Sequence, residues 1–159
     1  YVQRRNEMRV RKTTVFTGPI DEYFGYDLGT LDYRGQKRTH SYHPEVRYAQ
    51  PCGQVNNPMH AGGPHIRTLE WKHMMEREFA DRIVGTVLTT ETPFTPQNSS
   101  DYEYPFPDER NAILYRRYRQ RADALPNVLI AGRLGEYRYY DMDQAIARAM
   151  QLARTILTL

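Results

Sequence analysis

Residues 127–142 read Asn127-Val128-Leu129-Ile130-Ala131-Gly132-Arg133-Leu134-Gly135-Glu136-Tyr137-Arg138-Tyr139-Tyr140-Asp141-Met142. Val128 to Ala131 has the length and β-branched content of a buried strand, and apolar side chains recur at helical spacing from Asp141 to Leu157. The loop between them is therefore a strand-to-helix turn. Asp141 and Gln144 have the spacing of a helix-start capping box, and such a start leaves backbone N–H groups that favour negative charge. The stretch thus predicts a strand, a loop that faces an anion, and a helix.

The chain before this stretch alternates short β-rich runs with turns. We expect strands within 11–17, 31–42, 48–57, 66–72 and 84–92, a helical turn at 20–24, a helix at 74–82, and a longer helix that Asp108 or Asn111 starts and Pro126 ends. Because the strands are contiguous and the longer helices come last, the predicted fold class is α+β, a mainly antiparallel sheet followed by two helices. In the last helix we expect burial of Ala145, Ile146, Ala149, Leu152, Ala153, Ile156 and Leu157.

The composition favours a chain without a membrane span, a metal or a nucleic-acid partner. The 159 residues carry 22 basic against 19 acidic side chains, and no apolar run approaches the length of a membrane span. Basic residues cluster at 4–12 and 116–121, which we interpret as solvated faces. The single cysteine, Cys52, excludes an internal disulfide and favours a reducing, cytoplasmic setting. The five histidines lack metal-ligand spacing, so no metal is expected.

Two segments resemble a known family. Residues 132–142 are similar to the flavin-and-substrate segment Gly-Arg-Leu-Ala-Glu-Tyr-Lys-Tyr-Tyr-Asp-Met of UDP-galactopyranose mutases, and they differ from it only at Gly135 and Arg138. Thr17-Gly18-Pro19-Ile20-Asp21 resembles the Tyr-Thr-Gly-Pro-Ile-Asp segment of the same family, in the same order along the chain. Two long motifs in register over nearly the whole chain make coincidence improbable.

The resemblance implies roles for individual residues. It implies substrate binding by Asn56, Arg67, Tyr104 and Tyr139, catalysis by Arg67 and Glu91, and cofactor binding by Arg133, Tyr139, Asp141 and Met142. The resemblance implies that Arg67 and the two tyrosines contact the diphosphate and that Asn56 faces the sugar. Guanidinium groups and phenol hydroxyls are suitable hydrogen-bond donors for phosphate oxygens. The structural alternatives are that Arg67 pairs with Glu70 or Glu91 and that Tyr104 packs beside its prolines.

The chain also departs from the family pattern. His65 and Ile66 stand where the family has Tyr-Thr, Trp71 stands where it has a histidine, and Phe106-Pro107 follow where it commonly has Val. These departures fall around the sugar and the phosphates, so they concern the identity of the substrate more than that of the cofactor.

The resemblance implies a flavin-dependent isomerase that interconverts UDP-galactopyranose and UDP-galactofuranose, or a related nucleotide sugar, for cell-wall polysaccharide biosynthesis. It implies reduced FAD as the cofactor, with attack of its N5 on the anomeric carbon, and it allows a homodimer in the full-length protein. No Gly-x-Gly-x-x-Gly fingerprint follows a strand, so we expect these residues to be the C-terminal portion of a flavoprotein, inactive alone. The expected division is a substrate-binding sheet region at 1–107 and, at 108–159, a helix-strand-helix segment that returns to the absent FAD-binding domain.

Two other functions stay open at this point. A flavin-dependent oxidoreductase of the amine-oxidase-like fold would need an apolar or aromatic substrate cage. A non-catalytic fragment that binds a nucleotide sugar or another polyanion would need only the arginines and tyrosines.

Overall fold

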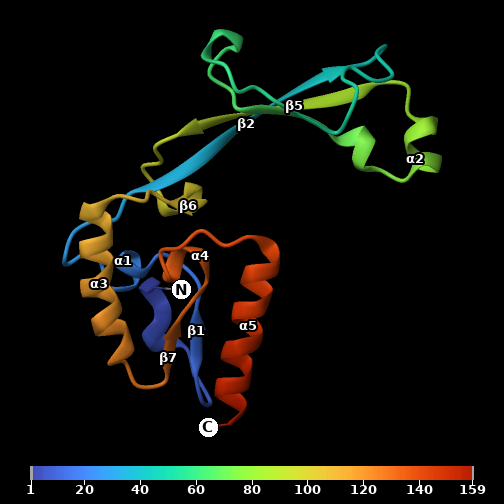
Figure 1. Cartoon of the computed structure of the whole chain (residues 1–159). Coiled ribbons are helices and arrows are strands. Elements are labelled where there is room, and N and C mark those ends of the chain that lie inside the picture. Colours follow the sequence, from blue (N-terminus) through green and yellow to red (C-terminus); the bar gives the residue numbers. More distant parts are fainter. Residues whose placement is uncertain (1, 159) are drawn as a thin grey trace. The chain divides into compact units, whose positions relative to one another are not determined.

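The computed structural model of the protein describes residues 2–158, and the side chains of Gln3, Asn6 and His60 fall outside that description (Figure 1). The chain forms two compact units. Unit 1 combines the residues up to Arg34 with those from Thr95 onward, and unit 2 comprises Gly35–Phe94. Unit 1 is therefore built from two separate stretches of sequence, and unit 2 from one.

Unit 1 contains most of the helices and a two-stranded parallel ribbon. Strand β1 (Thr14–Phe16) pairs with β7 (Val128–Ile130), with Thr14 opposite Val128 and Phe16 opposite Ile130. The other elements are η1 (Val2–Glu7), α1 (Ile20–Tyr23), η4 (Ser99–Asp101), β6 (Tyr104–Pro105), α3 (Glu109–Asp123), α4 (Gly132–Gly135) and α5 (Met142–Leu157).

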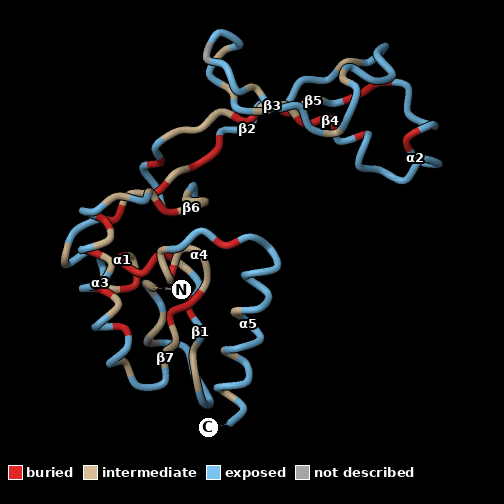
Figure 2. Tube along the Cα trace, viewed as in Figure 1, coloured by how far each residue is buried: buried red, intermediate tan, exposed pale blue. Residues whose placement is uncertain are grey.

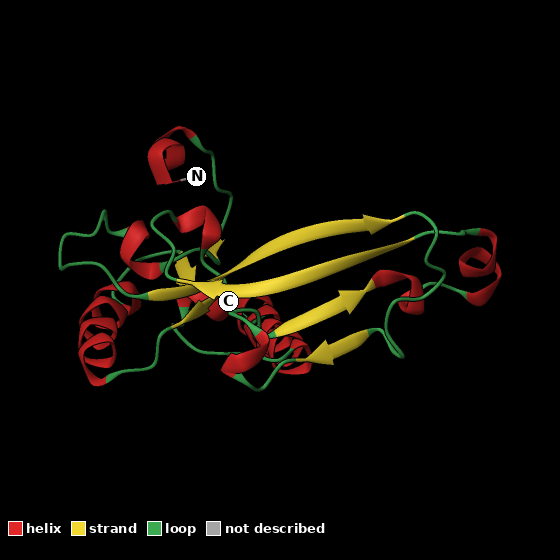
Figure 3. Ribbon diagram, turned by 90° about the horizontal axis from the view of Figure 1, so that it is seen from above, coloured by secondary structure: helices red, strands yellow, loops and turns green. Residues whose placement is uncertain are grey.

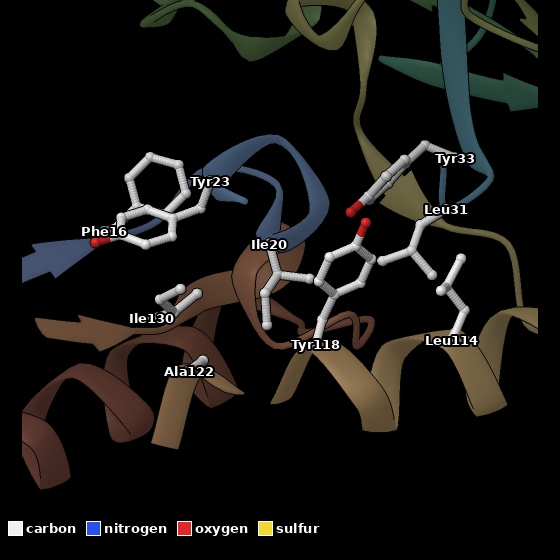
Figure 4. Packing of buried hydrophobic residues seen from close by; sticks show 9 residues of the cluster. All are labelled: Phe16, Ile20, Tyr23, Leu31, Tyr33, Leu114, Tyr118, Ala122 and Ile130. Carbon is white, nitrogen blue, oxygen red and sulfur yellow. The ribbon is translucent and has the colours of Figure 1, made fainter. Parts of the chain in front are cut away.

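The apolar core of unit 1 forms where α3 packs against α1 and the segment that follows it (Figure 4). Leu114, Tyr118 and Ala122 recur every fourth residue on α3 and are buried, as the spacing predicts. The Tyr118 hydroxyl donates to the Gly29 carbonyl (2.7 Å) and accepts the Leu28 N–H (3.0 Å), so a buried phenol fixes the turn before β2. The cluster as a whole contains Phe16, Ile20, Tyr23, Leu31, Tyr33, Leu114, Tyr118, Ala122 and Ile130.

The start of α3 confirms one prediction, and its basic face corrects another. Asp108 caps the helix by accepting the Asn111 N–H at 2.7 Å. Arg119 does not belong to a purely solvated face, because its Nη1 donates to the Ile130 carbonyl at 2.8 Å. This contact ties α3 to β7.

Unit 2 is organised by an antiparallel sheet (Figure 3). Its strands lie in the order β3 (Gln54–Asn56), β4 (Arg67–Glu70), β5 (Thr86–Phe94) and β2 (Tyr33–His43). Strand β2 begins in unit 1, where Tyr33 and Arg34 pair with β6, and from Gly35 onward it pairs with β5. Short helices complete the unit, namely η2 (His60–Gly62), η3 (Trp71–Met74) and α2 (Arg77–Arg82). The predicted α+β class with a mainly antiparallel sheet is thereby confirmed.

The predicted burial of the last helix is wrong for the residues that the structure describes. Helix α5 spans the predicted residues, yet none of its side chains is buried, and Ile146 and Leu157 are 61% and 84% exposed (Figure 2). Ala145, Ala149 and Ala153 are exposed, and Leu152 and Ile156 are half-buried. The apolar stripe lines a cavity of about 300 Å³, whose other wall is formed by β1, the residues after β7 and Tyr140. Amphipathic spacing predicted which side chains share a face but not what that face contacts.

We predicted a substrate-binding region at 1–107 and a segment at 108–159 that returns to the FAD-binding domain. This division by function stays a prediction.

Candidate functional site

Four polar residues lie directly opposite one another on the neighbouring strands of the unit 2 sheet, and we call such a row a rung. Three of the four are predicted site residues. The register places Asn56 opposite Arg67, Arg67 opposite Glu91, and Glu91 opposite Arg38. Residues directly opposite one another in antiparallel strands project from the same face of the sheet. The structure therefore brings Asn56, Arg67 and Glu91 together and adds Arg38, which the sequence analysis did not single out.

Glu91 is the centre of this rung. Its side chain is only 4% exposed, and its two oxygens accept hydrogen bonds from two arginines. Arg38 Nε donates to Oε1 at 3.0 Å, and Arg67 Nε donates to Oε2. The structural alternative for Arg67, a pair with Glu91, is thus present, and the side chains of Arg38 and Arg67 are 44% and 36% exposed.

The next rung on the same face contains Thr89, which Trp71 contacts from η3. The indole Nε1–H donates to the Thr89 hydroxyl at 2.6 Å, and His40 Nδ1 lies 2.7 Å from the same hydroxyl. Thr89 is fully buried, whereas Trp71 is 44% exposed. The hydrogen bond therefore fixes an indole with an exposed surface close to the arginine rung.

A second group of predicted residues lies in unit 1. The Arg133 guanidinium carbon lies 4.6 Å from the centroid of the Tyr139 ring, and the Tyr104 ring meets Tyr139 edge-on at 6.0 Å. Arg133 Nη2 donates to the Tyr140 carbonyl at 2.5 Å, which fixes the guanidinium. Tyr139 is 57% exposed, so this group offers a phenol beside a fixed cation.

A cavity of about 630 Å³ opens beside Tyr139. It is lined by prolines and aromatic rings with a few charged side chains, among them Pro105, Pro107, Tyr115, Arg116, Tyr137 and Arg138. Its size and mixed lining suit a small organic ligand.

Glu136 holds the loop of unit 1 in place, and sequence reasoning missed it. Its carboxylate accepts the Gly132 N–H (3.1 Å), the Tyr140 hydroxyl (3.1 Å) and Arg148 Nε (2.7 Å). Burial raises the pKa of Tyr140, and the Glu136 charge raises it further, so the phenol stays a donor. One carboxylate therefore connects α4, the loop and α5. Its position inside the quoted motif was the only signal in the sequence.

The start of α5 has the predicted capping box. Gln144 Oε1 accepts the Asp141 N–H at 3.1 Å, and Asp141 is the N-cap of the helix. Met142, the first residue of the helix, is 85% exposed. The positive end of the helix dipole is thus accessible from solvent in unit 1.

Comparisons with known proteins identify the family. The family model of UDP-galactopyranose mutase matches residues 1–139. The chain belongs to the UDP-galactopyranose mutase family. It is 36% identical to the UDP-galactopyranose mutase of Mycoplasma pneumoniae, over 93% of this chain and 37% of that protein. The corresponding protein of Mycoplasma genitalium is 29% identical, over 96% of the chain and 38% of the relative.

A further relative carries a different name. The dTDP-fucopyranose mutase of Escherichia coli is 30% identical, over 87% of this chain and 36% of that protein. The chain spans little more than a third of the length of these curated relatives, from 36% to 38%.

Membership of the mutase family leaves the roles of the individual residues as predictions. The structure groups Asn56, Arg67 and Glu91 in unit 2, and it groups Tyr104, Arg133 and Tyr139 in unit 1, with Asp141 and Met142 at the start of α5. Arg38 could not be assigned from the sequence, because strand register decides which residue faces Glu91.

The described residues contain neither a candidate metal site nor a candidate membrane span. Among the side chains that the structure describes, no three His, Cys, Asp or Glu residues gather where they could hold a metal ion. Within residues 2–158 no helix is both long enough and apolar enough to cross a bilayer.

Proposed function

We propose that the protein containing this chain is a nucleotide-sugar mutase that interconverts the pyranose and furanose forms of UDP-galactose or a related nucleotide sugar. The observation that carries the proposal is the rung around Glu91, where two arginines share one buried carboxylate. Partly exposed arginine side chains that a buried carboxylate holds in place suit an anionic diphosphate. The relatives are named as mutases of two different nucleotide sugars, and these names support a mutase reaction on a nucleotide sugar.

The residues of unit 2 would hold the nucleotide sugar by its phosphates. Arg67 would donate to the phosphate oxygens and stabilise the negative charge that grows on the diphosphate as its bond to the sugar breaks. Glu91 would act as a positioning residue, because it holds the arginine side chain in place rather than facing the ligand itself. Asn56, opposite Arg67 on the neighbouring strand, would donate to sugar hydroxyls.

For unit 1, the family resemblance implies phosphate contacts by Tyr104 and Tyr139, and we propose the same role for them in this chain. Both are phenols, and Tyr139 lies against the fixed cation of Arg133. A phenol close to an arginine is a good donor to an anionic oxygen.

The family implies FAD, and the residues of unit 1 fit that group. The exposed start of α5 offers backbone N–H groups and a positive dipole end, which suit the electron-rich edge of a reduced flavin. Arg133, Tyr139, Asp141 and Met142 would hold the cofactor there. When bound in its reduced form, FAD supplies a nucleophile for the anomeric carbon of the sugar. The protein itself would orient the flavin and the nucleotide sugar and would retain the nucleotide diphosphate.

The test compares Arg67→Ala with Arg82→Ala in the protein that contains these residues. Arg82 is the control, because it also has one carboxylate partner, Glu78 at 2.9 Å, but is 70% exposed on α2. Loss of a charge-assisted contact should weaken UDP binding by about 1.5–3 kcal/mol in Arg67→Ala, whereas Arg82→Ala should change it by less than about 0.5 kcal/mol. Calorimetry measures UDP affinity, and chromatography of the two sugar forms measures turnover with reduced flavin.

Two results would contradict the proposal. One is the absence of pyranose–furanose interconversion with both UDP-galactose and dTDP-fucose. The other is an equal, negligible effect of the two substitutions on affinity and on turnover.

A further inference from the structure

Trp71 brings an aromatic ring to the polar face of the unit 2 sheet, and no role has been assigned to it above. The rung that contains Arg67 and the rung that contains Thr89 lie on the same face, because alternate residues of a strand project to one side. Two residues of a strand span about 7 Å, which is the distance between these rungs. The indole contacts Thr89, so it is a close neighbour of the residues proposed to bind the nucleotide sugar.

The backbone on both sides of Trp71 is anchored. Glu70, the residue before it, is fully buried, and its carboxylate accepts the Thr86 hydroxyl at 2.6 Å. Lys72, the residue after it, is 4% exposed, and its ammonium group donates to the Arg47 carbonyl at 3.0 Å. Trp71 itself is 44% exposed. A half-exposed indole is thus carried by a backbone that two buried side chains hold in place.

The single polar atom of the indole is already used. A tryptophan side chain has one hydrogen-bond donor, Nε1–H, and no acceptor. That donor is given to the hydroxyl of Thr89, a fully buried residue, at 2.6 Å. The same hydroxyl can donate its own hydrogen to His40 Nδ1, 2.7 Å away. The exposed part of Trp71 therefore offers a ligand only an apolar, aromatic surface.

Such a surface discriminates between sugars that are otherwise alike. A sugar hydroxyl against the indole would lose its hydrogen bonds to water and gain none, whereas a methyl group there would be buried favourably. The relatives are named as mutases of galactose and fucose nucleotides. Fucose is 6-deoxygalactose, so these two sugars differ in whether C6 is a hydroxymethyl or a methyl group. C6 is thus the atom at which an indole can separate them.

We propose that Trp71 is a specificity-determining residue, which contacts C6 of the sugar and favours a 6-deoxy nucleotide sugar over one that carries a 6-hydroxyl group. This inference rests on the proposed function, since it takes the nucleotide sugar of that reaction as the ligand. The rival explanation is that Trp71 only covers Thr89 and stabilises unit 2.

The test uses two substrates that differ at C6 alone, UDP-galactose and UDP-6-deoxygalactose, with the protein that contains this chain. The ratio of their kcat/KM values with reduced flavin measures the preference, and calorimetry measures the affinity for UDP, which lacks the hexose. The unsubstituted protein should favour the 6-deoxy sugar by about tenfold to a hundredfold, the range that an apolar pocket reaches against an added hydroxyl.

Trp71→His is the decisive variant, because an imidazole has a second ring nitrogen that can bond a 6-hydroxyl group. It should lower the preference for the 6-deoxy sugar by about tenfold or more and leave the affinity for UDP unchanged. Trp71→Phe keeps an apolar ring without the bond to Thr89, so it should keep the preference. If Trp71→His does not fold by circular dichroism, Trp71→Tyr replaces it and should shift the ratio in the same direction, because its hydroxyl can also bond a 6-hydroxyl group.

The matched control is Phe79→His on α2. It exchanges another half-exposed aromatic ring of unit 2, 53% exposed, for an imidazole. This substitution should change neither the preference between the two sugars nor the affinity for UDP.

The outcomes also separate this inference from the proposed function. Absence of turnover with both sugars in the unsubstituted protein overturns both. Turnover without a preference for the 6-deoxy sugar, or a preference that Trp71→His leaves unchanged, overturns this inference alone. Equal losses for the two sugars and for UDP in Trp71→His would show that Trp71 only stabilises unit 2, and that too overturns it.

Discussion

Glu70 is a fully buried carboxylate in unit 2, and hydrogen bonds compensate for its burial. It accepts the Thr86 hydroxyl at 2.6 Å and the backbone N–H groups of Ala49 and Gln50 at 3.0 and 2.9 Å. Burial by itself raises the pKa of Glu70, but these donors and the nearby His73 outweigh it, and the pKa is lowered. The carboxylate thereby joins β4, β5 and the loop before β3.

We predict that Glu70→Gln lowers the free energy of unfolding by about 2 kcal/mol at pH 7, because an amide N–H would face groups that are themselves donors. The folded-state pKa is lowered, so the stabilisation is present above the unfolded-state pKa of about 4.3 and is lost as the pH falls through the folded-state value. The difference between the two proteins should therefore shrink below pH 4. Urea unfolding, followed by the fluorescence of Trp71, the one tryptophan, measures the free energy of unfolding of both proteins at each pH.

The matched control is Glu78→Gln on α2. Glu78 is 75% exposed and pairs with Arg82 at the surface, so its loss should change the free energy of unfolding by less than about 0.5 kcal/mol. Equal effects of the two substitutions, or a difference that does not begin to shrink below pH 4, would contradict the account of Glu70.

At the scale of residues, the sequence predicted which residues belong to the candidate site better than it predicted which residues they contact. The motif resemblance singled out Arg67 and Glu91, and the structure pairs them. It did not single out Arg38 or Glu136, because their contacts depend on strand register and on a loop conformation with Tyr137 at a φ of 46°. Neither feature has a signature in local spacing.

At the scale of elements, α5 shows where periodicity is informative. Its span and its capping box follow from local sequence, and both were predicted. The surface against which its apolar stripe packs depends on the rest of the fold, and that prediction was wrong for the described residues. Polar contacts at its first half, above all Arg148 to Glu136 at 2.7 Å, fix the helix to the loop.

We predict that one alanine inserted between Tyr140 and Asp141 abolishes mutase turnover in the protein that contains this chain. The insertion rotates α5 by about 100° relative to the loop, as a turn of 3.6 residues requires. Arg148 then leaves Glu136, and the backbone N–H groups of the helix start leave their alignment with Tyr139. Conversion of the two sugar forms with dithionite-reduced flavin measures the effect.

The control inserts one alanine after Leu157, at the far end of α5, which leaves the helix start in place. This variant should keep its turnover, and both variants should keep their helical circular dichroism. Wild-type turnover in the Tyr140 variant would show that the loop only connects a strand to a helix, and the role proposed for the start of α5 would be wrong.

At the scale of the whole molecule, the sequence did not reveal that unit 1 is discontinuous. The parallel pair β1–β7 joins residues 14–16 to residues 128–130, and such a long-range pair leaves no local pattern in either strand. Each short run predicted a strand correctly, but the order of the runs along the chain does not show that β1 pairs with β7. That unit 2 is inserted in sequence between the two stretches of unit 1 became visible only in the three-dimensional structure.

The two units differ in what they bury, and a deletion can test this difference. The clustered apolar core lies wholly in unit 1, from Phe16 to Ile130. In unit 2, the described residues that are buried and apolar are Leu69 and Ala80, alongside the polar Gln36, Glu70, Lys72, Thr86, Thr89 and Glu91. Since apolar burial supplies most of the folding free energy, unit 1 should not need unit 2 in order to fold.

We therefore predict that a chain in which two glycines replace residues 35–94 still unfolds cooperatively. The join is short because Gly35 and Phe94 are opposite one another, about 5 Å apart, where the chain leaves and re-enters unit 1. Residues 35–94 expressed alone should show no cooperative transition, because six buried polar groups and two apolar ones do not offset the chain entropy. Near-ultraviolet circular dichroism of the tyrosines during heating measures the unfolding transition of both chains.

The control is Ile20→Asp, which places a charge in the core of unit 1 and should abolish the transition of the shortened chain. A shortened chain that is already unfolded without this substitution would show that unit 1 depends on unit 2.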